Sequence, residues 1–239
     1  MRALVVAIRE LRAVFDAPTG YVVLALFPAL AAFFFFATGG FFDIGEASLR
    51  GFFGLMPWLL VLLAPAVTMR MWAEERRSGT EELLRSYPFR VSDLVLGKFL
   101  GALGVLAAAL VLTLAVPLTV TGLGDLDWGP VLGGYLSTLL LGSASLAVGL
   151  FLSACTQNQI VAWMLAAVVL VGFNLIGAAA TAEAMPPELG RLLLAADFGQ
   201  RFHAITRGVV DLRDVLFYVG ATTFFLAANG IALERRRWT

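Results

Sequence analysis

Residues 52–71 read FFGLMPWLLVLLAPAVTMRM, and Arg70 is the only charged residue among them. A helix that crosses the hydrocarbon core of a bilayer needs about 20 mostly apolar residues. The sequence therefore predicts an all-α, polytopic membrane protein with six transmembrane helices in a single domain over residues 1–239. The other five predicted spans are residues 21–37, 97–120, 131–153, 160–180 and 215–233.

The composition of the whole chain agrees with this prediction. Of the 239 residues, 60% are hydrophobic and 14% are charged, against about 25% charged in an average soluble domain. A soluble domain of this length cannot hide so much apolar surface from water. The 17 basic and 17 acidic residues cancel, so charge indicates no nucleic-acid partner. A single cysteine, Cys155, excludes an internal disulfide.

Residues 2–15 have a different pattern from the spans. Apolar residues recur at helical spacing on one side, and basic residues fall on the other, which is typical of a helix lying on the membrane surface. A helix of soluble type, packed on protein, is the alternative. The apolar side is Leu4, Ile8, Leu11 and Phe15. Residues 16–20, which include Pro18 and Gly20, are expected to turn the chain into the membrane.

The loop charges predict the orientation. If the N-terminus is cytoplasmic, twelve of the 17 basic residues lie in inner segments and five in outer segments, as the positive-inside rule requires. Six spans then place both termini in the cytoplasm. Two connections are long, an inner one at about 72–96 and an outer one at 181–214. A short amphipathic or re-entrant segment and a plain capping helix are the alternatives for the outer one.

The inner connection contains signals for a short helix across the cytoplasmic face. Ser78 and Glu81 have the spacing of a capping box, and Pro88 would end the helix. Gly79 allows a turn where the second span leaves the membrane, and Ser92 is expected to cap the third span. Such a segment suits docking of a cytosolic partner, and the residues are equally consistent with a solvated loop.

This stretch resembles the first cytoplasmic loop of ABC-2-type transporter permeases, in particular the six-span subgroup of gliding-motility and copper-enzyme-maturation transporters. The resemblance rests on the pattern from Pro65 through Ala73-Glu74-Glu75-Arg76 and Ser78-Gly79-Thr80 to Pro88, followed by residues 96–99. It implies that residues 74–88 form the coupling segment and that residues 2–15 form the elbow helix. The implied ATPase-coupling residues are Glu74, Glu75, Arg76, Ser78, Gly79, Thr80, Glu82, Leu84 and Pro88.

The resemblance also implies partners and a location. A permease of this type resides in the plasma (inner) membrane, forms a homodimer or a hetero-pair with a second permease, and binds two copies of a cytosolic ABC ATPase. Residues 92–99 contain Gly97-Lys98 but lack the first glycine of a phosphate-binding loop. ATP and magnesium are therefore expected in the partner and no cofactor in this chain, and export is the commoner direction in the family.

Few polar residues lie inside the predicted spans. Asn174 and Asn229 are the strongest, and they are candidates for helix–helix hydrogen bonds or for a transport pathway. The lack of buried acids and bases argues against a proton-coupled carrier. An ATPase-independent membrane-embedded enzyme or assembly factor is the alternative, but no catalytic or metal-binding set is apparent. Gly97 and Gly101, like Gly129 and Gly133, have the spacing that permits close helix contact.

Overall fold

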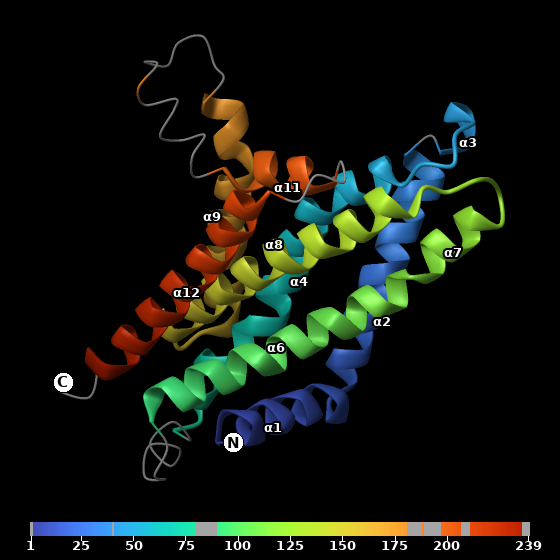
Figure 1. The fold of residues 1–239 in the computed structure, drawn as a ribbon. Coiled ribbons are helices and arrows are strands. Elements are labelled where there is room, and N and C mark those ends of the chain that lie inside the picture. Colours follow the sequence, from blue (N-terminus) through green and yellow to red (C-terminus); the bar gives the residue numbers. More distant parts are fainter. Residues whose placement is uncertain are drawn as a thin grey trace.

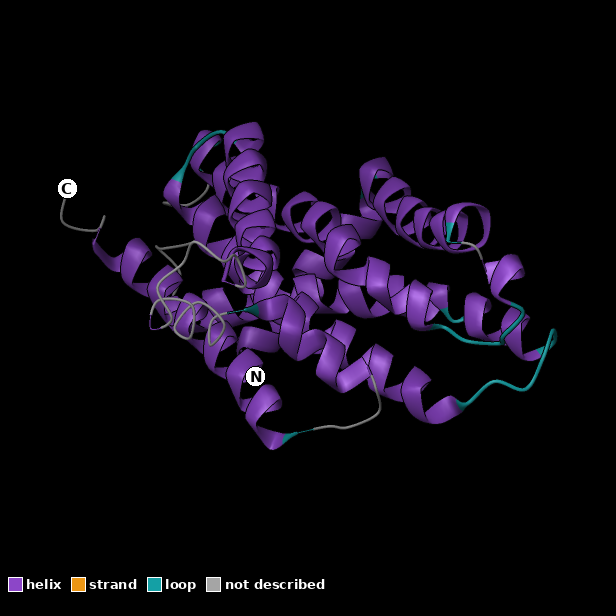
Figure 2. Cartoon of the chain, turned by 90° about the horizontal axis from the view of Figure 1, so that it is seen from above, coloured by secondary structure: helices purple, strands orange, loops and turns teal. Residues whose placement is uncertain are grey.

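Six helices of the computed structural model are long and apolar enough to cross a membrane. The structure describes residues 2–39, 41–79, 90–180, 188, 197–206 and 211–235. Figures 1 and 2 show helices and connecting loops over this part of the chain, with no strand. The predicted all-α, six-span membrane fold is therefore confirmed.

The helix bounds follow the apolar segments, with shorter helices between them. The helices are α1 (Arg2–Asp16), α2 (Pro18–Phe33), η1 (Phe34–Thr38), α3 (Phe41–Ile44), α4 (Arg50–Arg77), α6 (Val91–Thr113), α7 (Ala115–Thr121), α8 (Trp128–Cys155), α9 (Gln159–Ala180), α11 (Phe198–Thr206) and α12 (Leu212–Arg235). The start of α1 and the end of α12 lie on the same side of the bundle (Figure 1), which we call the N-terminal face.

Helices α4 and α6 differ from the sequence prediction at the N-terminal face. Helix α4 continues past Met71 to Arg77, and α6 begins at Val91, before the predicted start at Gly97. The N-cap of α6 is Arg90, whose backbone N–H donates to the Asp93 carboxylate. The prediction that Ser92 caps this helix is therefore wrong. The helix begins one residue before Ser92, and the Asp93 carboxylate accepts the backbone N–H of the N-cap residue Arg90.

Pro117 interrupts the third predicted span. The helix breaks at Leu114, between α6 and α7, and the Leu114 N–H bonds to the carbonyl of Val111. A proline has no N–H to offer to the carbonyl four residues earlier, which belongs here to Thr113, and its ring clashes with that turn. The chain then continues helically through Pro117 to Thr121.

Helix α8 forms the centre of the bundle, since it packs against α4, α6, α9, α11 and α12. Its glycines admit large neighbours at close range. A Cβ at Gly134 would collide with the ring of Phe53, and a Cβ at Gly142 with the side chain of Leu106. Close approach of this kind lets van der Waals packing hold helices together in lipid, where no hydrophobic effect separates them from their surroundings.

Helix α1 lies alongside α6 at close range on the N-terminal face (Figure 1). The glycine pair 97 and 101 provides the contact, because a Cβ at Gly97 would lie 2.8 Å from the Ala3 carbonyl oxygen and one at Gly101 2.8 Å from Cβ of Glu10. The other side of α1 exposes Leu4 and Ile8. One face of α1 therefore packs on protein while the opposite face remains apolar and exposed.

Within the predicted outer connection, α11 lies on the opposite side of the bundle from α1 (Figure 1). Its buried residues include Phe198 and Phe202. The Phe198 ring stacks on Phe173 of α9 with centroids 4.7 Å apart, and the Tyr218 hydroxyl of α12 donates to the Phe198 carbonyl at 2.6 Å. A short amphipathic helix is thus present there, held between two membrane-length helices.

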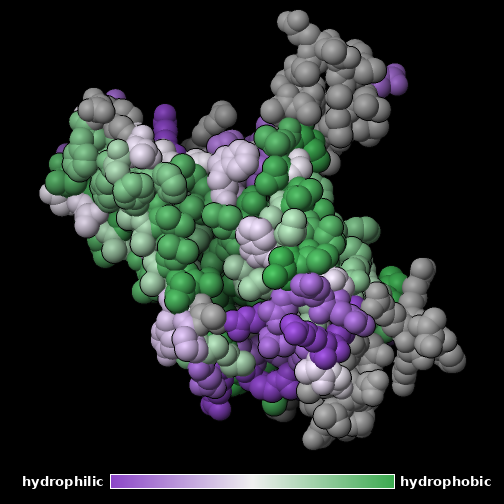
Figure 3. Space-filling model, turned by 180° about the vertical axis from the view of Figure 1, so that it is seen from behind, coloured by the Kyte–Doolittle hydropathy of each residue, from purple (hydrophilic) through white to green (hydrophobic). Residues whose placement is uncertain are grey.

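The surface of the protein divides into an apolar girdle and a hydrophilic end. Figure 3 shows hydrophobic residues over most of the described face and a concentrated hydrophilic area at its lower end, the level at which α1 lies in Figure 1. Such an arrangement places the apolar girdle in lipid and the charged residues at the water boundary.

Candidate functional site

The end of α4 carries the first residues of the predicted coupling segment. Arg77 is the last helical residue. The Ser78 hydroxyl donates to the Glu74 carbonyl at 2.9 Å and to the Glu75 carbonyl at 3.3 Å, which helps to satisfy the acceptors at the helix end. Gly79 follows with a φ of 72°. That left-handed conformation suits glycine, so the predicted turn at Gly79 is present.

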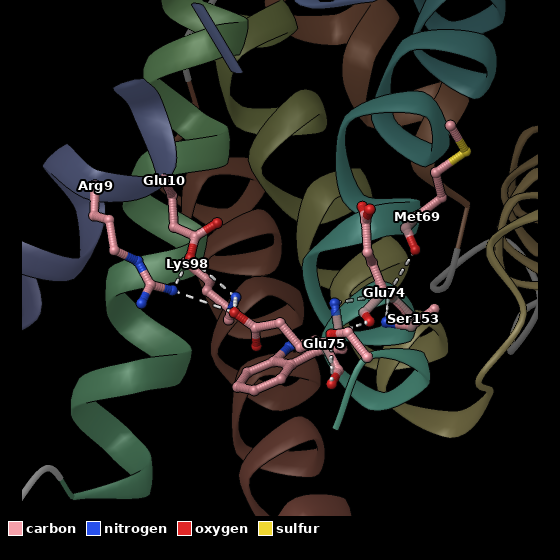
Figure 4. Close-up of polar contacts among 10 residues, drawn as sticks. Arg9, Glu10, Met69, Glu74, Glu75, Lys98 and Ser153 are labelled. Carbon is pink, nitrogen blue, oxygen red and sulfur yellow. Dashed lines mark hydrogen bonds and ion pairs between the residues drawn. The ribbon is translucent and has the colours of Figure 1, made fainter. Parts of the chain in front are cut away.

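Four charged side chains from three helices converge beside this end, and we call them the charge cluster (Figure 4). The Lys98 ammonium of α6 lies 2.8 Å from the Glu75 carboxylate of α4 and 3.0 Å from the Glu10 carboxylate of α1. The Arg9 guanidinium of α1 contacts the same two carboxylates, at 2.8 Å from Glu10 and 3.2 Å from Glu75. Two cations and two anions therefore alternate and balance.

Burial makes this cluster more than a surface ion pair. The Lys98 side chain is 1% exposed, and those of Glu10 and Glu75 are 12% and 16% exposed. The Lys98 ammonium also lies over the ring of Trp72, 4.8 Å from its centroid, an attractive cation–π geometry. Burial by itself would raise the pKa of Glu10, but Lys98 and Arg9 outweigh it and hold that pKa below its ordinary value.

A serine of α8 fixes the same stretch of α4 from the other side (Figure 4). The Ser153 hydroxyl donates to the Met69 carbonyl at 3.1 Å and accepts from the backbone N–H groups of Trp72 and Ala73 at 3.2 and 3.3 Å. Hydrogen bonds buried between helices hold register because an unsatisfied partner is costly. The final turns of α4 are thus bound to α1, α6 and α8.

The structure separates the predicted coupling residues by exposure. Glu74, Ser78 and Gly79 are exposed, whereas Glu75 points inward to the charge cluster and Arg76 is half-buried. Thr80, Glu82, Leu84 and Pro88, together with the predicted capping partner Glu81, lie outside the described residues. Within this turn, Glu74, Ser78 and Gly79 therefore face outward, whereas Glu75 holds helices together.

Sequence reasoning did not assign a role to Arg9, Glu10 or Lys98. Lys98 could have been singled out, because a lysine that follows Gly97 at the start of an apolar span needs a partner. Glu10 lies on the side of α1 that contacts α6, next to the basic residues. Nothing in the sequence pairs these two residues, which are 88 positions apart.

The two polar candidates inside the spans have different surroundings. Asn229 of α12 is 0% exposed, and neither polar atom of its side chain has a hydrogen-bond partner among the described residues. Asn174 of α9 is half-buried, and its side-chain oxygen is likewise unpartnered within that part of the chain. The described residues thus offer no interhelical hydrogen bond to the Asn229 side chain.

An all-α bundle of six membrane-length helices, with an amphipathic helix crossing one face, defines a multi-pass integral membrane protein. Residues 40–196, more than half of the chain, match the family described as "ABC-2 family transporter protein". The chain belongs to this family and is the permease component of an ABC transporter. No curated protein sequence matches it significantly.

Proposed function

We propose that this permease couples ATP hydrolysis by a separate cytosolic ABC ATPase to export across the plasma membrane. Permeases of this family normally work with an ATP-binding subunit. In the proposal the N-terminal face is cytoplasmic, as the excess of basic residues on its connections favours. Two ATPase copies bind a pair of permeases, which is either a homodimer or a hetero-pair, and the ATPase copies carry the nucleotide and magnesium.

The observation that carries the proposal is the charge cluster at the end of α4. A partner that binds the exposed Glu74, Ser78 and Gly79 contacts the turn of α4 in which Glu75 is bound to α1 through Arg9 and to α6 through Lys98. Displacement of this end is therefore transmitted to three helices together. A solvated loop that served only for orientation would need no such buried connection.

The predicted coupling residues have two roles in this proposal. Glu74, Ser78 and Gly79, with Thr80, Glu82, Leu84 and Pro88 beyond them, form the docking surface for the ATPase. Glu75 acts as a positioning residue, because its carboxylate binds Lys98 and Arg9 and is turned away from a partner. Arg76 belongs to the same turn.

The test compares two identical charge reversals at opposite ends of the bundle. Glu74→Lys changes the proposed docking surface, and Glu46→Lys changes an exposed acid in the connection before α4, on the other side. Each variant is co-expressed with a candidate ABC ATPase subunit, purified in nanodiscs, and assayed for co-elution and ATP hydrolysis. We expect Glu74→Lys to lose the ATPase and Glu46→Lys to retain it.

Two results would count against the assignment. If wild-type protein binds none of the candidate ATPases, an ATPase-independent membrane-embedded enzyme or assembly factor becomes the better explanation. If Glu74→Lys binds as well as Glu46→Lys does, the docking surface lies elsewhere. A reporter fused to either terminus tests the orientation separately, since a signal from the cytoplasmic side is required at both ends.

A further inference from the structure

A cavity of about 670 Å³ lies at the N-terminal face between α1, α2, α4 and α6. This volume is within the range of pockets that bind small molecules, roughly 300–1,000 Å³. The charge cluster forms part of its wall, and Lys98 within that wall is 1% exposed. The cavity is therefore built around a buried charged group as well as around apolar side chains.

The lining of the cavity changes from apolar to charged along α4. Ala66 and Val67 line it further from the helix end, together with Val22 and Val23 of α2. Glu74 and Ser78 line it at the end that reaches the charge cluster. At 1.5 Å per residue, this change extends over roughly 18 Å of helix. That length exceeds the headgroup region of one leaflet, roughly 5–8 Å, so the cavity is long enough to reach from the headgroups into the hydrocarbon.

The apolar part of the cavity adjoins surface that faces lipid. Val22 lines the cavity and is 61% exposed, and Leu26, one turn further along α2, is 52% exposed. A molecule with an acyl chain can therefore extend from the charged end of the cavity into the bilayer. A wholly water-soluble ligand would leave the apolar walls without a partner.

The charges in the lining select the headgroup. Three basic residues, Arg9, Arg70 and Lys98, and three acidic residues, Glu10, Glu74 and Glu75, line the cavity. Arg9 and Lys98 balance Glu10 and Glu75, so a purely anionic headgroup would be repelled chiefly by the exposed Glu74 carboxylate. A headgroup with both charges places its phosphate at the half-exposed Arg9 guanidinium and its ammonium at the exposed Glu74 carboxylate.

We propose that the cavity holds one phospholipid of the adjacent leaflet with a phosphoethanolamine headgroup, as a resident ligand that bridges α1 and α4. The bound lipid would stabilise the arrangement of the charge cluster, because a ligand that binds only the folded state shifts the equilibrium toward it. The proposal concerns the permease alone and does not depend on which ATPase binds it.

The test measures lipid retained by the purified permease, without ATPase, using native mass spectrometry after addition of phosphatidylethanolamine or phosphatidylglycerol. Ala66→Trp fills the apolar part of the cavity. Val168→Trp is its matched control, since Val168 is 68% exposed on α9 and does not line the cavity. We expect one retained phosphatidylethanolamine in wild type and in Val168→Trp, and at least a tenfold loss in Ala66→Trp.

A second variant tests the headgroup without filling the cavity. Glu74→Gln removes an exposed carboxylate, and we expect it to lower the preference for phosphatidylethanolamine over phosphatidylglycerol by about tenfold, the factor that corresponds to 1.4 kcal/mol. The proposal is overturned if Ala66→Trp retains as much lipid as Val168→Trp. Equal retention of the two lipids by wild type would overturn it as well.

Discussion

Replacement of Lys98 by methionine removes the buried cation that joins α1, α4 and α6. Methionine keeps most of the length and apolar volume of the lysine stem, so the change is chiefly electrostatic. It leaves Glu10 and Glu75 beside each other with only Arg9 between them. Of the two cations in the charge cluster, Arg9 then remains for two largely buried carboxylates.

The magnitude follows from the geometry. Unit charges 2.8–3.0 Å apart attract by about 6 kcal/mol at an effective dielectric constant of roughly 20, but the cost of burying Lys98 offsets much of this. Removal of one partner from a buried pair costs about 3–5 kcal/mol. Because both carboxylates keep some exposure and retain Arg9, we expect about 2–3 kcal/mol.

Thermal unfolding in detergent or nanodiscs provides the assay. For a chain of this size each kcal/mol shifts the melting temperature by roughly 2–4 °C, so Lys98→Met should melt about 4–12 °C below wild type. Arg12→Met is the matched control, since Arg12 is an exposed cation on α1. Addition of Glu75→Gln to Lys98→Met should restore part of the loss, because it removes one of the two carboxylates that then share Arg9.

The same variant tests the transmission of force. We expect Lys98→Met to retain ATPase binding at the exposed Glu74 while transport per ATP hydrolysed decreases. The reasoning about the charge cluster is refuted if Lys98→Met unfolds at the same temperature as Arg12→Met. It is also refuted if the losses of stability from Lys98→Met and Glu75→Gln simply add in the double variant.

Three further measurements follow from particular contacts. Gly97→Leu should displace α1 and lower stability by a few kcal/mol, because even a Cβ there would contact the backbone of α1. Gly104→Ala should lower stability much less, because its Cβ would contact only the end of the Leu11 side chain. Equal melting temperatures for the two variants would contradict this. Ser153→Ala should cost about 1–3 kcal/mol through lost buried hydrogen bonds, and an unchanged melting temperature would show that they contribute nothing. Since the pKa of Glu10 lies below its ordinary 4.5, the stability that Glu10 contributes is present above pH 4.5 and is lost as the pH falls through the depressed pKa. The stability difference between wild type and Glu10→Gln should therefore shrink on acidification. A difference that stays constant with pH would argue against this role of Glu10.

The sequence alone determined the class of fold, because a bilayer imposes a length and an apolar composition that can be read from local residues. The six spans, the amphipathic helix over residues 2–15, the break caused by Pro117 and the turn at Gly79 all depend on such local properties. Each is a matter of helix length, periodicity or backbone freedom, and none requires knowledge of a distant partner.

The boundaries at the N-terminal face needed more than local signals. Residues 72–77 carry Glu74, Glu75 and two arginines, which by hydropathy end a span, yet α4 continues through them. Trp72 and Ala73 are held by Ser153 from another helix, and Glu75 by Lys98. Tertiary contacts thus extend the helix beyond the apolar segment that predicts it.

The charge cluster was decided only by the tertiary structure. Glu10 and Lys98 are 88 residues apart, and Glu75 and Arg9 are 66 apart, so no spacing in the sequence pairs them. They meet because glycines 97 and 101 let α1 lie directly on α6. The sequence supplied the charges, but close packing of helices brought them within bonding distance, where burial makes the interaction strong.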